Sequence, residues 1–181
     1  MKAYKFLRRG AIAPISGVPW PTAASGPGPW MEVEGPLAPC RSGLHACRVE
    51  SLAYWLHDEL WEIELDGELA RAEDLLVSRR ARLVRHLEVW GSGVASRLLA
   101  ASRAHAVDLV DAATPAGKER ARLWIQAAGR HVALGNVALG AYTAAMAVAR
   151  LDCEAADVVR FREERLWQSG FIAAELGLSG D

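Results

Sequence analysis

The stretch that decides the fold is residues 59–65, ELWEIEL, in which apolar and polar residues alternate from Trp61 to Leu65. Successive side chains of a β-strand point to opposite faces, so Trp61, Ile63 and Leu65 would share one face. Glu62 and Glu64 would share the other face, in contact with water. The pattern predicts a half-buried strand and argues against a general-base role for these two glutamates, because that role needs a carboxylate whose pKa is raised by burial.

The segments on either side of this stretch predict a small sheet around it. Asp66-Gly67 follows directly and predicts a tight turn. Residues 74–90 fit either a strand or one face of a helix, and we favour the strand. Ser51 is suited to cap a short helix that ends near His57. Further short strands are expected at residues 3–8, 30–34 and 43–47.

Residues 10–29 are expected to form a long loop, because they hold five prolines and four glycines. A loop of this length in a small domain often covers or forms a binding site. Trp20 lies inside the loop, and Trp30 follows it directly. An exposed tryptophan is unfavourable, so we expect the loop to fold back onto an apolar surface.

The composition changes near residue 91, and the chain beyond this point has the pattern of helices. Residues 94–112 carry apolar side chains at helical spacing. Thr114-Pro115 provides an N-cap and a first helical residue for the next helix. Asp152 is suited to cap a final helix that ends near Leu176.

These segments together predict an α+β protein made of two parts. Residues 1–90 would form a small mixed or antiparallel sheet with one short helix. Residues 91–181 would form an all-helical bundle packed on that sheet. A chain of 181 residues is long enough to bury such cores without disulfides or a metal.

The composition also argues against several classes of partner. The formal net charge is −1 and no basic tail is evident, which argues against nucleic acid. Residues 132–149 carry no charge, but they are rich in alanine and glycine, so we interpret them as a buried helix and not as a membrane span. Three cysteines and a charged start of the chain favour a reducing, cytoplasmic compartment.

The motif Cys40-x-x-Gly43-x-His45-x-Cys47 brings two thiols and an imidazole into eight residues. His45 and Cys47 would lie on one face of a strand, where the imidazole could lower the pKa of the Cys47 or Cys40 thiol. On this hypothesis Cys47 is a nucleophile and His45 its base. The alternative is structural, with Cys47 as a small buried residue and His45 as a core polar group.

The same motif is a weak signature for zinc. A structural zinc ion needs about four ligands, and it favours CxxC pairs that are missing here. A fourth ligand would have to come from a distant side chain, namely His57, His86, His131 or Cys153. We therefore predict no metal.

Aromatic and basic residues supply a candidate ligand pocket. Trp20, Trp30 and Trp61 would line it, although the same tryptophans could build an ordinary aromatic core. Arg82 could clamp a carboxylate or phosphate, although the basic run at residues 79–85 could instead pair with nearby glutamates. The chain has no Walker A, GxGxxG, HExxH or GxSxG signature.

Four short segments carry a family resemblance, namely CRSGLHAC (40–47), LWEIELDG (60–67), DLLVS (74–78) and ARLVRHL (81–87). Through them residues 1–90 resemble an uncharacterised domain of phage and bacterial proteins whose function is unknown. The resemblance implies that the cysteines, glycine and histidine of the motif belong to one unit, and it carries no activity. The order of strands and helix is also distantly similar to the NAD-binding half of ADP-ribosyltransferases, which is a likeness of fold alone.

The leading hypothesis is a cytoplasmic protein that binds or transforms a small molecule at a Cys/His site on the N-terminal sheet, covered by the Pro/Gly loop. The first alternative is a non-enzymatic interaction or scaffold protein whose alanine-rich helices form the interface of a homo-oligomer. A weaker alternative is an NAD-binding protein like the ADP-ribosyltransferases. The sequence leaves open whether the protein is an enzyme and which cofactor it uses.

Overall fold

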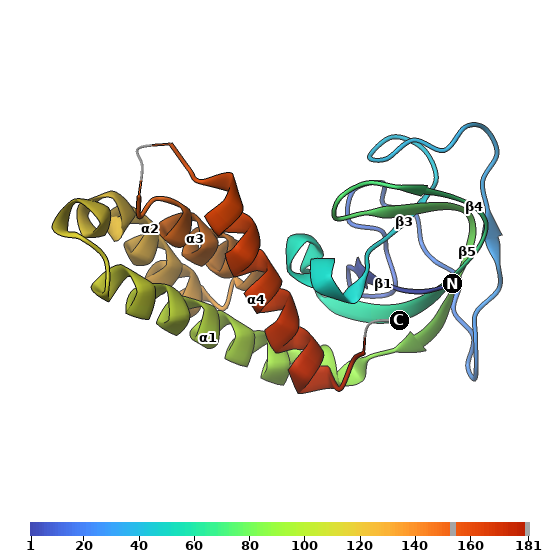
Figure 1. The fold of residues 1–181 in the computed structure, drawn as a ribbon. Coiled ribbons are helices and arrows are strands. Elements are labelled where there is room, and N and C mark those ends of the chain that lie inside the picture. Colours follow the sequence, from blue (N-terminus) through green and yellow to red (C-terminus); the bar gives the residue numbers. More distant parts are fainter. Residues whose placement is uncertain (153–154, 180–181) are drawn as a thin grey trace. The chain divides into compact units, whose positions relative to one another are not determined.

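The computed structural model describes residues 1–152 and 155–179, and Cys153 therefore lies outside the described residues (Figure 1). The chain divides into two compact units. Unit 1 comprises Met1–Gly91 together with the residues from Leu176 onward, and unit 2 comprises Ser92–Glu175. Unit 1 holds an antiparallel sheet and unit 2 holds helices, which confirms the predicted α+β class.

The sheet of unit 1 has five strands, all paired in antiparallel fashion. The strands are β1 (Lys2–Leu7), β2 (Met31–Glu32), β3 (Leu44–Ala46), β4 (Glu59–Arg71) and β5 (Leu76–His86). Their order is β1-β4-β5-β2, and β3 also pairs with β5. The long pair β4 and β5 therefore forms the centre of the sheet, and residues 74–90 contain the strand that we favoured.

The sheet curves far enough for its two sides to meet. Cys47, which directly follows β3, forms an isolated antiparallel bridge with Tyr4 of β1. Each of the two residues donates its N–H to the carbonyl oxygen of the other, at 2.8 Å in both cases. We call this bridge the Tyr4–Cys47 clasp.

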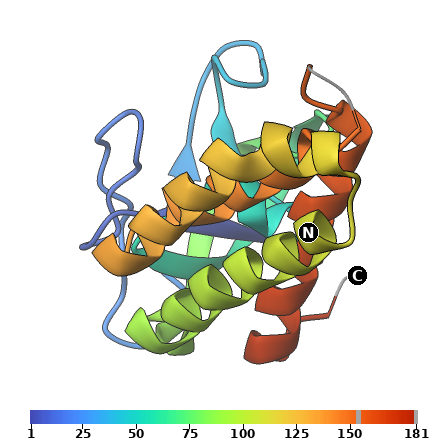
Figure 2. The ribbon, with the colours of Figure 1, turned by 90° about the vertical axis from the view of Figure 1, so that its left-hand side faces the viewer.

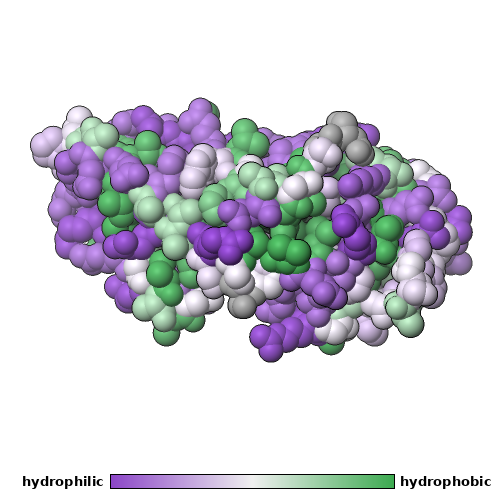
Figure 3. Space-filling model, turned by 90° about the horizontal axis from the view of Figure 1, so that it is seen from below, coloured by the Kyte–Doolittle hydropathy of each residue, from purple (hydrophilic) through white to green (hydrophobic). Residues whose placement is uncertain are grey.

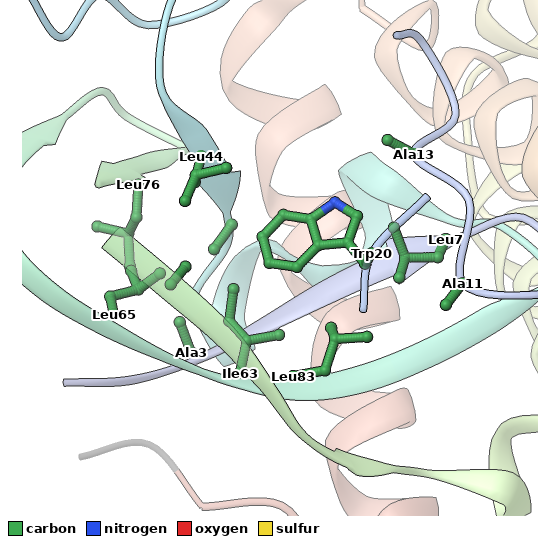
Figure 4. Packing of buried hydrophobic residues seen from close by; sticks show 12 residues of the cluster. Ala3, Leu7, Ala11, Ala13, Trp20, Leu44, Ile63, Leu65, Leu76 and Leu83 are labelled. Atoms are coloured by element: carbon green, nitrogen blue, oxygen red, sulfur yellow. The ribbon is translucent and has the colours of Figure 1, made fainter. Parts of the chain in front are cut away.

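The core of unit 1 forms where the loop of residues 10–29 folds back onto the sheet. Trp20 is only 5% exposed and packs against the inward side chains of the strands. Figure 4 shows its indole in the middle of a cluster that includes Leu7, Leu44 and Ile63. The expectation that this loop covers its tryptophan with apolar contacts is confirmed.

Two local predictions in unit 1 are wrong. Asp66-Gly67 is not a turn, because β4 continues to Arg71 through a shift in register between Asp66 and Leu69. Gly67 has a φ of 77° there, and the Ser78 hydroxyl donates to the Asp66 carbonyl at 2.8 Å, so this acceptor stays bonded despite the irregularity. Ser51 is not an N-cap, because it lies buried inside a 3₁₀ helix, η1 (Val49–Trp55).

The outer face of β4 and β5 carries a ladder of ion pairs. Four acidic side chains of β4 pair with arginines of β5, namely Glu62–Arg85, Glu64–Arg82, Asp66–Arg80 and Glu68–Arg79. Opposite charges on directly opposed strand positions stabilise the pairing and its register. The basic run of residues 79–85 is therefore engaged with the sheet's own carboxylates.

Unit 2 consists of four helices, α1 (Ser92–Asp111), α2 (Pro115–Leu134), α3 (Val137–Ala149) and α4 (Val158–Leu176) (Figure 2). Thr114 caps α2, since its hydroxyl accepts from the Gly117 N–H, as predicted. The last helix ends at Leu176 as predicted, but its predicted start is wrong. α4 begins at Val158, and Asp157, not Asp152, accepts from its free N–H groups.

Buried polar groups hold α4 within unit 2. The Gln168 amide donates to the Ala141 carbonyl of α3 at 2.9 Å. Glu164 is almost fully buried, and its carboxylate lies 2.8 Å from His105 Nδ1 of α1. These bonds satisfy polar groups that would be costly to bury alone.

Within the described ranges, every helix is too short or too polar to cross a bilayer. Residues 132–149 do not form one helix, because Gly135 ends α2 in a left-handed conformation and Asn136 caps α3. On the face of the molecule that Figure 3 shows, hydrophilic residues are interspersed with apolar ones over both units.

Candidate functional site

A pocket of about 460 Å³ opens in unit 1 beside the Tyr4–Cys47 clasp. Its wall comes from residues 4–6 of β1, residues 13–16 of the loop, the 40–47 segment that carries β3, residues 54–57 at the end of η1, and Leu75. Sequence segments that are distant from one another therefore converge on it. The pocket includes three residues of the Cys/His motif side by side, namely Cys40, His45 and Cys47.

The pocket exists because β1 and the β3 segment separate after the clasp. A regular antiparallel ladder would continue from Tyr4 and Cys47 to a pairing of Phe6 with His45. Instead, the His45 carbonyl oxygen accepts a hydrogen bond from the Lys5 side chain, with Nζ at 2.5 Å. The lysine amine thus replaces a main-chain donor at the point where the two strands part.

Lys5 sits in an unusual environment for a lysine. It follows Ala3 and precedes Leu7 on the inward face of β1, and its Nζ lies 4.9 Å from the centre of the Trp20 ring. Burial lowers the pKa of Lys5 to about 8, and the nearby Cys47 thiol offsets this only in part. No carboxylate in the described part of the chain is among the groups that shift this pKa.

The shape of the 40–45 loop depends on two residues with a positive φ, a backbone conformation that favours glycine. Cys40 has a φ of 62°, and Gly43 has a φ of 117°. A Cβ at position 43 would also lie 2.2 Å from Val77 Cγ1 of β5, so the glycine of the motif lets the loop approach the sheet. The spacing of the motif is therefore explained by the shape of this loop.

The His45 side chain stabilises the same loop through a hydrogen bond to its backbone. Its Nε2 accepts a hydrogen bond from the Cys40 N–H at 3.1 Å, which requires the proton of a neutral ring to be on Nδ1. Burial is the main reason why the pKa of His45 is lowered, and the Lys5 charge lowers it further. The ring is therefore neutral at physiological pH and already engaged with the backbone.

Cys47 has the environment of an unreactive thiol. It is 1% exposed, and its Sγ donates to the Tyr4 carbonyl at 3.5 Å. Burial raises the pKa of the Cys47 thiol to about 12, although the Lys5 charge acts in the opposite direction. A nucleophilic cysteine needs a lowered pKa, so this environment does not favour the predicted thiolate chemistry with His45 as base. Cys40 is an exposed free thiol at the pocket.

The tryptophans predicted to line the pocket are engaged elsewhere. Trp20 belongs to the core behind Lys5. Trp30 lies between two guanidinium groups, those of Arg80 and Arg82, each 4.4 Å from its ring centre. These positions are outside the wall of the pocket.

The side chains of Trp61 and Arg82 also interact with residues outside the pocket wall. Trp61 stacks on His86 with ring centres 4.7 Å apart, and its Nε1 donates to Glu59 at 3.0 Å. Arg82 Nε donates to Glu64 at 2.8 Å as part of the ion-pair ladder. Both side chains therefore serve the sheet and lie away from the pocket.

Sequence reasoning did not assign Lys5, Arg41 or His57 to the pocket, although it named His57 as a distant candidate ligand for zinc. All three join His45 in the wall. The available signal was the alternation in β1, which places a lysine between two apolar inward positions. For Arg41 and His57, which lie in irregular segments, the sequence offers no comparable signal.

The ionisable side chains of the wall are strongly biased toward positive charge. Among the described residues, the wall includes two cations and two histidines but no carboxylate. The nearest acid to His57 is Asp58, whose carboxylate lies 3.3 Å from His57 Nδ1 outside the wall. In a chain with a net charge of −1, this local excess of basic groups favours a negatively charged guest.

A metal centre is not formed by the motif. In the ranges that the structure describes, no three His, Cys, Asp or Glu side chains come close enough together to hold a metal ion. Cys153, one of the distant ligands considered for zinc, lies outside the described residues.

The fold and the site define an α+β protein with a basic pocket at the split between two strands. Comparison with protein-family models, with curated proteins and with solved structures found no match to this chain. The resemblances to the phage and bacterial domain and to the ADP-ribosyltransferases therefore stay predictions.

Proposed function

We propose that unit 1 binds a small organic acid, with an apolar body and a carboxylate group, in the pocket beside Cys40, His45 and Cys47. The observation that carries this proposal is the combination of size and charge. A volume of about 460 Å³ is within the usual range for small-molecule sites, and the charged side chains of the wall are cations.

Two basic side chains would hold the carboxylate. Arg41 can present two parallel N–H donors to a carboxylate, and Lys5 adds a second positive charge. The rest of the wall is largely apolar or aromatic, with Phe6, Trp55 and Leu56 among its residues. A guest with one charged end and one apolar end would satisfy both parts.

The Pro/Gly loop would cover the apolar end of the guest. Residues 13–18 form a tight turn, in which the Ala13 N–H donates to the Val18 carbonyl at 2.9 Å. Ile15 lies at the tip of this turn, is 93% exposed, and is part of the pocket wall. An apolar side chain that is this exposed at the mouth of a pocket would gain contacts when a ligand binds.

The test is a ligand-observed NMR screen of the full chain with small aromatic carboxylates, each matched with its neutral primary amide. We expect the carboxylates to bind and the amides to bind more weakly, by about tenfold, because a charge-assisted hydrogen bond is lost. Arg41→Gln should weaken carboxylate binding to a similar degree. Arg9→Gln, an exposed control outside the wall, should leave it unchanged. Equal binding of acids and amides would contradict the proposal.

The proposal places the protein in a reducing cytoplasm, in keeping with its free Cys40 and Cys47 thiols.

A second candidate function is self-association through unit 2, where apolar side chains such as Leu123 and Leu134 are 63% and 77% exposed. Light scattering on the purified chain tests it. A monomer at all concentrations would exclude this scaffold role.

A further inference from the structure

The Lys5 amine lies in the pocket wall, where it donates to the His45 carbonyl and lies over the Trp20 ring. We propose that this amine condenses reversibly with the carbonyl group of a 2-oxo acid or aldehyde acid held in the pocket, an inference that rests on the proposed function. The product would be an imine between Lys5 Nζ and the former carbonyl carbon. The carboxylate of the same guest would pair with Arg41.

The contacts of Lys5 favour this chemistry. Its Nζ donates to the His45 carbonyl and lies over the Trp20 ring, so a neutral acceptor and an aromatic face surround it. Lys2, three positions earlier on the opposite face of β1, has a different environment. Its Nζ lies 3.5 Å from the Glu62 carboxylate, and an ion pair of this kind keeps an amine protonated and therefore unreactive.

Protonation also distinguishes Lys5 from an ordinary lysine. With a pKa of about 8, roughly a quarter of the Lys5 amine is neutral at pH 7.5. An amine with the ordinary value of 10.5 would be neutral in only about one molecule in a thousand. The pKa of Lys2, in contrast, is raised. A neutral lone pair is what attack on a carbonyl carbon requires.

The proposed step needs no oxidant or reductant. The Nζ lone pair forms a bond to the carbonyl carbon while the C=O π electrons move to oxygen. A proton passes from nitrogen to that oxygen and gives a carbinolamine. The hydroxyl group then takes up a proton from solvent and leaves as water as the C=N bond forms, and the iminium nitrogen returns a proton to solvent. One amine and one carbonyl compound thus give one imine and one water.

The chain contains internal controls, because its only lysines are Lys2, Lys5 and Lys118. The full chain would be incubated at pH 7.5 with glyoxylate and sodium cyanoborohydride, which reduces an imine to a stable secondary amine. Peptide mapping with fragment spectra then measures the modification of each lysine and of the N-terminal amine separately. We expect Lys5 to be modified at least about tenfold faster than Lys2 or Lys118.

The pH profile of the unmodified protein provides a second measurement that needs no variant. The rate at Lys5 should rise through about pH 8, where half of the amine is neutral, and level off about one pH unit higher, where the amine is almost fully neutral. The rate at Lys2, whose pKa is raised above the usual value, should continue to rise beyond that pH. Equal rates and parallel profiles for the three lysines would overturn the inference.

Two measurements on the wild-type protein separate this inference from the proposed function. The NMR screen reports carboxylate binding, and peptide mapping reports modification at position 5. If carboxylates bind but Lys5 of the wild-type protein is not modified preferentially, the imine is excluded and the binding pocket stands. If carboxylates do not bind at all, the proposed function fails first.

Discussion

Burial at the level of single residues decides which groups around the pocket can react. Cys47 and Lys5 lie close together, and burial disfavours the charged form of each. For the thiol this means a protonated, unreactive sulfur, whereas for the amine it means a neutral nucleophile. One apolar environment therefore suppresses the cysteine and activates the lysine.

The lowered pKa of Lys5 also predicts how this residue affects the free energy of unfolding. Its pKa is about 8 in the folded chain and 10.5 when unperturbed, so between these pH values the unfolded chain binds more protons. Stability due to Lys5 therefore rises with pH across this window, and the cost of burying the charge is present in full below pH 8.

Comparison with Lys5→Met isolates this contribution, because the effects of other titrating groups cancel. The free energy of unfolding of the wild type, relative to the variant, should increase by about 1–3 kcal/mol between pH 7.5 and 10.5. Urea unfolding at a series of pH values measures it. A constant difference between the two proteins would show that Lys5 titrates normally.

At the scale of elements, the pocket depends on how the 40–45 loop approaches β5. Gly43 combines a positive φ with a close contact to Val77, whereas Gly67 has a positive φ and open space around it. Both positions disfavour a side chain through the backbone. Only position 43 would also force a neighbouring strand to move.

Gly43→Ala should therefore destabilise the protein more than Gly67→Ala. We expect about 1–2 kcal/mol for Gly67→Ala from backbone strain alone. Gly43→Ala should cost a further 1–3 kcal/mol, roughly the penalty for overpacking a core, and it should also weaken ligand binding. Urea unfolding of both variants measures the difference. Equal losses would mean that the loop adjusts freely.

The sequence was a good guide to elements with a regular pattern. Alternation at residues 59–65 predicted β4, and Thr114-Pro115 predicted the start of α2, because each signal is local. Asp66-Gly67 was misleading, because a glycine in the left-handed region suits a bulge as well as a turn. The Ser78 hydroxyl, twelve residues away, settles the choice by bonding to Asp66.

The candidate site was predicted only in part. The motif correctly brought Cys40, His45 and Cys47 to one place, since they lie within eight residues of chain. The alternation of polar and apolar residues does not reveal how deeply a side chain is buried. The raised pKa of the Cys47 thiol could therefore not be predicted from the sequence. The meeting of Lys5 with this motif depends on the pairing of β1 with the β3 segment, which is a tertiary contact.

At the scale of the whole molecule, each unit has a hydrophobic core of its own. One core surrounds Trp20 in unit 1. The other lies among the alanine-rich helices of unit 2, around residues such as Ala121 and Ala144. Units with separate cores can unfold at different denaturant concentrations.

Two probes can follow the units separately in one urea titration. Circular dichroism at 222 nm follows the helices of unit 2, and reaction of the buried Cys47 with a maleimide, read by peptide mapping, follows unit 1. We expect the two midpoints to differ. Coincident midpoints would show instead that the chain unfolds as one cooperative body.

The Tyr4–Cys47 clasp limits the size of the guest that the pocket can admit. Only two main-chain bonds hold β1 to the β3 segment at this point, and both amide protons are committed to them. A guest too bulky for the resting cavity could enter only by separating that pair, which would expose the two protons to solvent. The rate at which these two protons exchange for deuterium would then measure how often the pocket opens.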